Sequence, residues 1–186
     1  MENQPFASPP LKGELRREVR AKKRAFTAQQ LEEMSVGVVE RLLRNPHFAS
    51  ARTVLLYHSL PDEVCTHRLL DSLKGKTVLL PKVTGDSTME LRLYTSPCDL
   101  ATGAFGIEEP VGAAFADYGA IDVAVVPGMA FDAQGHRLGR GRGYYDRLLA
   151  QMPSVYKIGL CFGFQLLDNV PSEATDIVMD EVVSKM

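Results

Sequence analysis

A glycine–arginine segment holds the most concentrated candidate chemistry in this chain. It follows a continuous apolar run and precedes a stretch with the apolar spacing of a helix, and its core reads Gly139, Arg140, Gly141, Arg142 and Gly143. Glycine lets backbone N–H groups approach an anion without a Cβ in the way, and a following helix points its positive end at the same place. Strand, glycine loop and helix in this order predict a phosphate-binding loop.

The glycine spacing of this loop is G-x-G-x-G, so it supports neither the G-x-x-x-x-G-K-[ST] phosphate loop nor the G-x-G-x-x-G dinucleotide fingerprint. From the residues alone, an ordinary helix-entry loop with solvated arginines stays open. An arginine–glycine RNA-binding tract is disfavoured, because such tracts are repetitive and disordered, whereas this one occurs once between apolar elements.

A second basic segment spans residues 12–24, where seven cations face two anions for a local charge of +5. Lys12, Arg16 and Arg20 are spaced four apart, which places them on one face of a helix. Two cations on one helical face can clamp phosphate oxygens. A solvated basic stripe is the alternative.

The whole chain has 21 Lys+Arg and 23 Asp+Glu, a formal net charge of -2. Residues 137–147 carry +3, so everything outside the two basic segments sums to -10. Two short basic segments therefore lie in an acidic protein, so the near-neutral total does not exclude an anionic partner.

Length and composition predict a single domain over residues 1–186, with residues 1–10 as a loosely ordered lead. The chain is 45% hydrophobic and long enough to bury roughly 70% of its unfolded surface. It has no apolar run near the roughly 20 residues of a membrane span and no apolar stretch of a signal peptide, so we expect a cytoplasmic protein. Cys65, Cys98 and Cys161 are far apart and fit neither a disulfide framework nor a zinc site.

Helix and strand patterns alternate along the chain. Apolar spacing predicts helices over 11–24, 27–44, 64–73 and from 144 onward, the second opening on a capping box of Thr27 and Gln30. Strands are predicted over 53–57, 77–81, 89–94 (exposed or edge), 121–126, 156–162 and 177–183, with 96–119 as a long connection across the sheet's edge. Such alternation favours a three-layer α/β domain, with a largely parallel sheet covered by helices on both faces and its active cleft at the carboxyl ends of the strands.

With these motifs in place, the sequence resembles the 5-formyltetrahydrofolate cyclo-ligase family, also called 5,10-methenyltetrahydrofolate synthetase. The resemblance covers nearly the whole chain, and its most specific part is the ten-residue loop from Arg137 to Asp146. The other matching segments, in the family's order, are Lys12-Gly-Glu-Leu-Arg16, Ser59-Leu-Pro-Asp-Glu-Val-Cys-Thr66, Val126-Pro-Gly with Phe131-Asp132, Phe105-Gly-Ile-Glu-Glu-Pro110 and Asp176-Ile-Val-Met-Asp180.

Membership would imply an enzyme that turns 5-formyltetrahydrofolate and MgATP into 5,10-methenyltetrahydrofolate, ADP and phosphate. The family route phosphorylates the formyl oxygen, so that N10 can attack the formyl carbon and phosphate can leave. Such a transfer needs charge neutralisation and alignment more than a covalent nucleophile. The resemblance also implies a fold similar to the sugar-phosphate isomerase and CoA-transferase-like folds.

The resemblance implies roles for residues at matching positions. It implies ATP contacts at Lys12, Gly13, Glu14, Leu15, Arg16, Arg137, Leu138, Gly139, Arg140, Gly141, Arg142, Gly143, Tyr144 and Tyr145. It implies folate contacts at Arg16, His58, Glu63, Arg140, Gly141, Arg142, Gly143 and Tyr144. Within these sets we expect Arg140, Arg142 and Tyr144 to act in catalysis. Asp146 and Asp176 match the magnesium ligands, and Asp180 is a weaker alternative that we expect to be structural.

Three departures from the family pattern are modest. Cys65 stands where Asp or Asn is frequent, Arg142 replaces a common Lys, and Thr175 stands where His is frequent. His136 has no assigned family role, and we expect it at the surface. None of these changes removes an expected phosphate or metal group.

Two rival functions remain: a sugar-phosphate isomerase or related phosphate-binding enzyme that works without ATP, and a non-catalytic protein that sequesters folate or nucleic acid. The paired carboxylates count against the second, since a mere anion binder does not need them. The partners we expect are 5-formyltetrahydrofolate and ATP, with no nucleic acid and no membrane, and with the chain acting as a monomer.

Overall fold

The computed structural model describes residues 11–103 and 106–185, so the expected lead over 1–10 lies outside the described residues. A seven-stranded sheet forms the centre, in the order β12 (Glu181–Val183), β10 (Tyr156–Leu160), β7 (Val123–Pro127), β1 (Thr53–Leu55), β2 (Thr77–Val83), β3 (Met89–Tyr94) and β6 (Ala114–Phe115). The first five strands of this order run parallel, and β3 and β6 are antiparallel additions. The expectation of a largely parallel sheet is confirmed.

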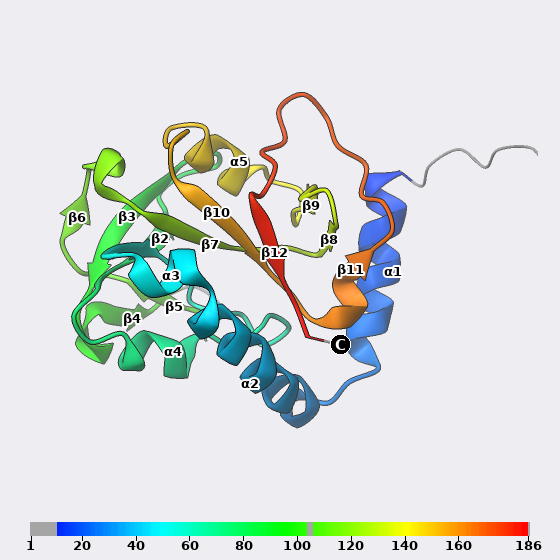
Figure 1. The fold of residues 1–186 in the computed structure, drawn as a ribbon, viewed down its shortest axis with the longest axis horizontal. Helices are drawn as coiled ribbons and strands as arrows, with labels where there is room; N and C mark the ends of the chain where they lie inside the picture. The colour runs from blue at the N-terminus through cyan, green and yellow to red at the C-terminus, as the bar shows by residue number, and fades with distance from the viewer. Residues whose placement is uncertain (1–10, 104–105, 186) are drawn as a thin grey trace, which may run out of the picture.

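Helices cover both faces of this sheet. Successive residues of β1 point to opposite sides: Val54 joins a core with α2 (Ala28–Arg44), α3 (Pro46–Ser50) and α4 (His67–Ser72), whereas Leu55 joins a core with α5 (Tyr144–Leu149). Figure 1 shows α2, α3 and α4 together along one side of the sheet. The domain therefore has the three-layer α/β architecture expected from the alternating pattern.

The first helix, α1 (Lys12–Arg24), belongs to neither layer. It stands at one end of the molecule beside a small sheet of β8 (Ala130–Asp132), β9 (Arg137–Leu138) and β11 (Leu166–Leu167) (Figure 1). Its buried Leu15 and Val19 pack with Met129 and Leu138 in a separate hydrophobic cluster. This packing holds the N-terminal helix against the segment that carries the glycine–arginine loop.

Short elements fill the connections, and they refine two expectations. The segment 96–119 contains β4 (Leu100–Thr102), β5 (Glu108–Pro110) and β6, together with the 3-10 turns Pro97–Asp99 and Tyr118–Ala120. Because β6 pairs with β3, the segment 89–94 lies next to the sheet's edge and not at it. A further 3-10 turn spans Gly163–Gln165.

Four predicted elements are shorter than expected. The strands expected over 53–57 and 156–162 end at Leu55 and Leu160, and two other elements begin later than expected because their backbone is bound elsewhere. The helix expected over 64–73 begins at His67, since the carbonyl of Val64 accepts the Tyr57 hydroxyl and the carbonyl of Thr66 accepts the helical N–H of Leu70. The strand expected over 177–183 begins at Glu181, since Met179 donates its backbone N–H to the carbonyl of Gly135 instead of to a sheet strand.

Strand order reverses between β1 and β7. From β1 the chain builds outward through β2 and β3 on one side, and β7, β10 and β12 follow on the other. Open α/β sheets bind ligands at such a switch point, beyond the carboxyl ends of the strands. Across residues 11–103 and 106–185, no helix combines the length and apolar character needed to cross a bilayer.

Candidate active site

A cleft opens at this switch point, with a cavity volume of about 480 Å³. Its floor is formed by Tyr57 and His58 after β1, residues 81–83 at the end of β2, and Pro127 and Gly128 at the end of β7. One wall is the glycine–arginine loop with the start of α5. A second cavity of about 540 Å³ adjoins it across His58, Leu60, Glu63, Ile107 and Glu108, which line both.

The glycine–arginine loop needs glycine at two of its positions for backbone reasons. Gly141 has a φ of 118° and Gly143 a φ of 65°, both in the region that side-chain-bearing residues rarely adopt. Gly143 is also the N-cap of α5, so the loop ends at the helix's positive pole. Arg16 of α1 donates from Nε to the carbonyl of Gly139 at 2.8 Å, which fixes the loop's first turn.

Arg137 leaves β9 as a buried cation beneath this loop. Its Nη2 donates to both carboxylate oxygens of Asp146 at 2.9 Å, and its guanidinium lies over the Tyr145 ring at 5.6 Å. Asp146 also accepts the backbone N–H of Ile177 at 3.2 Å. Within the described residues, Arg137 Nε is the one buried side-chain nitrogen or oxygen without a hydrogen-bond partner. Arg137, which lines the cleft, therefore has one hydrogen-bond donor that no described protein group uses.

Arg140 crosses the cleft mouth to the turn after β1. Its Nη2 donates to Asp62 Oδ1 at 2.6 Å and to Glu63 Oε1 at 2.8 Å, and its Nε donates to Glu63 Oε1 at 3.1 Å. The other oxygen of Glu63 accepts the N–H of Leu60 at 3.0 Å, which closes the turn. Burial alone would raise the pKa of Asp62, but hydrogen bonds from Arg140 and Lys23 outweigh it and lower that pKa.

His58 lines both cavities and is only partly exposed. Its ring stacks on His67 at 4.1 Å, and its Nε2 lies 3.4 Å from Glu108 Oε2. Burial and the neighbouring His67 lower the pKa of His58 against the opposing effect of Glu108. His58 is therefore mainly neutral at pH 7, able to accept or donate a hydrogen bond without adding charge.

The start of α5 is tied to the β2–β3 loop on the opposite wall. Tyr144 donates from its hydroxyl to Gly85 O at 3.1 Å, and Arg147 donates from Nε to Ser87 O at 2.7 Å. Arg147 also donates to the carbonyl of Arg142 at 2.6 Å, while Arg142 itself is exposed. These contacts leave the Arg142 side chain free to reach an anion at the cleft mouth.

Lys12 of α1 contacts the segment before β12 and does not line the cleft. Its Nζ lies 2.6 Å from Asp176 Oδ2 and 3.0 Å from Glu173 Oε1. Burial opposes the charged ammonium, but the bonds to Asp176 and Glu173 outweigh it and raise the pKa of Lys12. Asp176 keeps a lowered pKa in spite of burial, because Lys12 and the N–H of Glu173 hydrogen-bond to its charged form.

The rest of the N-terminal motif is structural in this conformation. Glu14 accepts the N–H of Leu11 at 3.3 Å at the start of α1, Leu15 is buried in the α1 cluster, and a Cβ at Gly13 would meet open space.

The two candidate magnesium ligands lie near each other, because Asp146 binds the residue that follows Asp176. Within the described residues, no three or more His, Cys, Asp or Glu side chains gather as a metal cluster. Mg²⁺ typically takes only one or two carboxylates and completes its shell with phosphate and water, so a two-carboxylate donor set fits it. Asp180 Oδ2 accepts the backbone N–H of Lys157 at 2.7 Å and lies 2.9 Å from Lys157 Nζ. These contacts support the structural role expected for Asp180.

His136 differs from expectation, since it is half-buried and not simply at the surface. Its Nδ1 lies 2.9 Å from Asp132 Oδ2. The fully buried Asp132 also accepts N–H groups from Gln134, His136 and Val170. This carboxylate closes the β8–β9 turn and thereby sets where Arg137 leaves β9.

Ten of the expected site residues line the cleft: His58, Glu63, Arg137, Gly139, Arg140, Arg142, Gly143, Tyr144, Tyr145 and Asp146. The others, outside that lining, are Lys12, Gly13, Glu14, Leu15, Arg16, Leu138, Gly141 and Asp176. The sequence did not indicate a role for other residues that line the cleft, which include Lys82, Met89 and residues 107–110. The motif that includes Glu108 and Glu109 was visible, but nothing in its residue types signalled a role.

Comparison with known proteins gives one consistent result. Residues 9–185 match the model of the 5-formyltetrahydrofolate cyclo-ligase family. The chain is 32% identical over 174 residues to the 5-formyltetrahydrofolate cyclo-ligase of Escherichia coli, covering 89% of this chain and 96% of that protein. It is 30% identical over 173 residues to a probable 5-formyltetrahydrofolate cyclo-ligase of Schizosaccharomyces pombe, covering 83% and 85%.

Solved structures agree with these sequence matches. The 5,10-methenyltetrahydrofolate synthetase of Aquifex aeolicus superposes with a TM-score of 0.82 at 38% identity, covering 94% of this chain and 90% of that one. The corresponding Mycoplasma pneumoniae structure, at 23% identity and a TM-score of 0.74 with 92% and 97% covered, supports the fold. The chain described here belongs to the 5-formyltetrahydrofolate cyclo-ligase family.

Proposed function

We propose that this protein is an ATP-dependent ligase that closes the ring of 5-formyltetrahydrofolate to give 5,10-methenyltetrahydrofolate, ADP and phosphate. One observation carries the proposal: a chain of this family places its glycine–arginine loop along a cleft at the topological switch point. Such a loop suits the triphosphate, and the cavity beside it leaves room for a second, flat substrate.

The chemistry explains why cations dominate one wall. The formyl oxygen is a poor leaving group until it carries the γ-phosphoryl group of ATP; N10 then attacks the formyl carbon, and that oxygen departs as part of phosphate. We assign Arg140 and Arg142 to neutralising the transferred group and Tyr144 to bordering the folate ring. Arg140 is hydrogen-bonded to Asp62 and Glu63, so these carboxylates compete with phosphate for its guanidinium.

For the substrates, we assign the ATP phosphates to residues 137–145 and to the helix cations Lys12 and Arg16. The orphan Nε of Arg137 supports this assignment, because a buried donor without a partner can be satisfied by an incoming phosphate oxygen. We assign the folate to His58 and Glu63, which come from the turn facing the loop, with Arg16 beside them.

We assign Mg²⁺ to Asp146 and Asp176. The ion supplies charge neutralisation to the β- and γ-phosphates when bound. Each carboxylate is paired with a cation in the described conformation, Asp146 with Arg137 and Asp176 with Lys12. Lys12 lowers the pKa of Asp176 and so favours its ionised form, while Arg137 fixes the position of Asp146 through hydrogen bonds to both of its oxygens.

The test is a spectrophotometric assay of the purified protein with 5-formyltetrahydrofolate and MgATP. We expect the absorbance band of the methenyl product to grow together with ADP, and ADP release to stop when the folate is omitted. Folate binding without that band would indicate a protein that sequesters folate without converting it. ADP release without folate would contradict the coupling of the two substrates.

The isomerase alternative is tested by the same assay, since a sugar-phosphate enzyme on this fold would show no folate-dependent ADP. Cytoplasmic location and a monomeric state stay predictions from the sequence.

A further inference from the structure

Three cations of α1 share one stripe of the helix, and each contacts a different loop around the cleft. Lys12, Arg16 and Lys23 are spaced by four and seven residues, which keeps them on one face. Lys12 binds Asp176, Arg16 binds the carbonyl of Gly139, and Lys23 binds the turn after β1. The first two belong to the motif already assigned to ATP, whereas no role has been given to Lys23.

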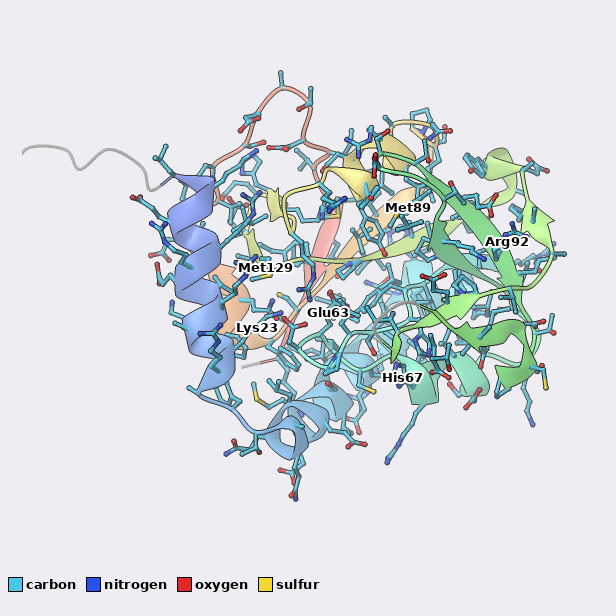
Figure 2. All side chains as sticks on the ribbon, turned by 180° about the vertical axis from the view of Figure 1, so that it is seen from behind. Lys23, Glu63, His67, Met89, Arg92 and Met129 are labelled. Carbon is cyan, nitrogen blue, oxygen red and sulfur yellow. The ribbon has the colours of Figure 1, made fainter. Side chains whose placement is uncertain are left out.

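Lys23 is buried, with 5% of its surface exposed. Its Nζ donates to the carbonyl of Asp62 at 2.5 Å and lies 3.1 Å from Asp62 Oδ2. It thus holds both the backbone and the side chain of one residue of the turn. Figure 2 shows Glu63 between α1, which carries Lys23, and β3, which carries Met89.

The same turn holds the residues assigned to the substrates. Asp62 Oδ1 binds Arg140, and the neighbouring Glu63 binds both Arg140 and the N–H of Leu60. A continuous chain of charge-assisted hydrogen bonds therefore runs from Lys23 through Asp62 to Arg140 and Glu63. Two cations face two carboxylates, so the network is neutral as a whole.

Packing alone does not account for a charge at position 23. A buried ammonium loses its hydration, and replacing buried ion pairs by apolar side chains of similar size is often neutral or stabilising. Burial lowers the pKa of Lys23, and the attraction of Asp62 offsets only part of this effect. An apolar side chain such as methionine would fill the same space but would leave the turn without its anchor to α1.

We propose that Lys23, acting through Asp62, is a positioning residue that sets the location of Glu63 against the folate. The inference rests on the proposed function, since it takes Glu63 as a substrate contact. It assigns Lys23 no contact with substrate. Its effect should therefore appear in the KM for 5-formyltetrahydrofolate more than in the KM for ATP.

The test compares Lys23→Met with Lys22→Met. Lys22 is the neighbouring lysine, exposed and paired only with Glu18 at 2.8 Å within the described residues, so it controls for loss of a helix cation. We expect Lys23→Met to raise the folate KM about tenfold, the scale of one charge-assisted hydrogen bond, with smaller changes in kcat and in the KM for ATP, because Arg140 keeps its hydrogen bonds to Glu63. Lys22→Met should match wild type in all three.

A double variant distinguishes positioning from a general loss of stability. If Lys23 acts through Asp62, Lys23→Met should raise the folate KM less in the Asp62→Asn background than in the wild type, because only the bond to the Asp62 carbonyl is left to lose. Additive effects, equal rises in both KM values, or a Lys23→Met folate KM equal to that of Lys22→Met would each overturn the proposal.

Two further controls keep the test decisive. If Lys23→Met does not fold, as judged by circular dichroism, Asp62→Asn removes the same side-chain bond from its more exposed partner, and an unchanged folate KM there overturns the proposal. If the wild-type protein makes no methenyl product, the proposed function fails. Calorimetric binding of 5-formyltetrahydrofolate to the two lysine variants then tests the positioning separately, and equal affinities overturn it.

Discussion

Gly141→Ala tests the phosphate loop through the backbone alone. Gly141 has a φ of 118°, which an alanine adopts only with strain, yet a Cβ there would have its nearest neighbour, Arg16 Cζ, at 3.8 Å. The substitution therefore adds no clash and removes no contact. A sparsely populated backbone conformation of this kind costs about 1–3 kcal/mol, which the loop relieves by moving its N–H groups.

Gly75→Ala is the matched control. Gly75 has a φ of 86°, a Cβ there would meet no atom within 4 Å, and it lies in the exposed connection between α4 and β2. The two variants should lose stability to a similar degree, with Tm falling by about 2–4 °C for each kcal/mol in a chain of this size. Only Gly141→Ala should disturb the nucleotide.

The assay is methenyl formation at saturating folate over a range of MgATP, with Tm measured on the same samples. We expect the KM for ATP to rise about tenfold in Gly141→Ala, equivalent to roughly 1.4 kcal/mol of lost binding, and to stay at the wild-type value in Gly75→Ala. If Gly141→Ala lowers Tm as Gly75→Ala does but leaves the ATP titration unchanged, the loop does not hold the phosphates.

Three further predictions concern the supporting residues. Asp146→Asn should raise the Mg²⁺ concentration for half-maximal activity, whereas Asp180→Asn should not; equal titrations would remove the ligand assignment. Hydrogen bonds hold the pKa of Asp132 below its ordinary value despite burial. The contribution of its ionised form to the free energy of unfolding is therefore complete above about pH 4 and falls as the pH drops further. Asp132→Asn should therefore lower the unfolding free energy by about 2–3 kcal/mol at pH 7, and by less in acid, as measured by urea titration. Gly159→Ala would place a Cβ 2.4 Å from the buried Phe131 ring, and it should cost about 1–3 kcal/mol through overpacking.

The sequence predicted those features whose causes are local. The capping box of Thr27 and Gln30 starts α2 where expected, since both partners lie within one turn. The glycine loop was predictable because glycine is the residue type that readily adopts a positive φ, as Gly141 and Gly143 do. The order of strands and helices indicated the layers, because apolar periodicity records which faces are buried.

The features that the sequence did not predict depend on contacts between distant residues. The small sheet of β8, β9 and β11 has strands of two or three residues, too short for any periodicity. The residues 177–179 are apolar enough for a strand, but the backbone N–H of Met179 donates to the carbonyl of Gly135. The anchor of Lys23 on Asp62 spans 39 positions, and no local pattern separates Lys23 from the exposed Lys22 beside it.

The position of α1 has a consequence for how the protein is made. This helix leaves the ribosome early, and Lys23 meets Asp62 only 39 residues later, but its other two polar contacts lie far ahead in the chain: Arg16 meets Gly139, 123 residues later, and Lys12 meets Asp176, 164 residues later. Such distant pairs close only after intervening segments are available, and they carry the largest loop entropy. The N-terminal end of α1 can therefore complete its contacts only when nearly the entire polypeptide has been translated.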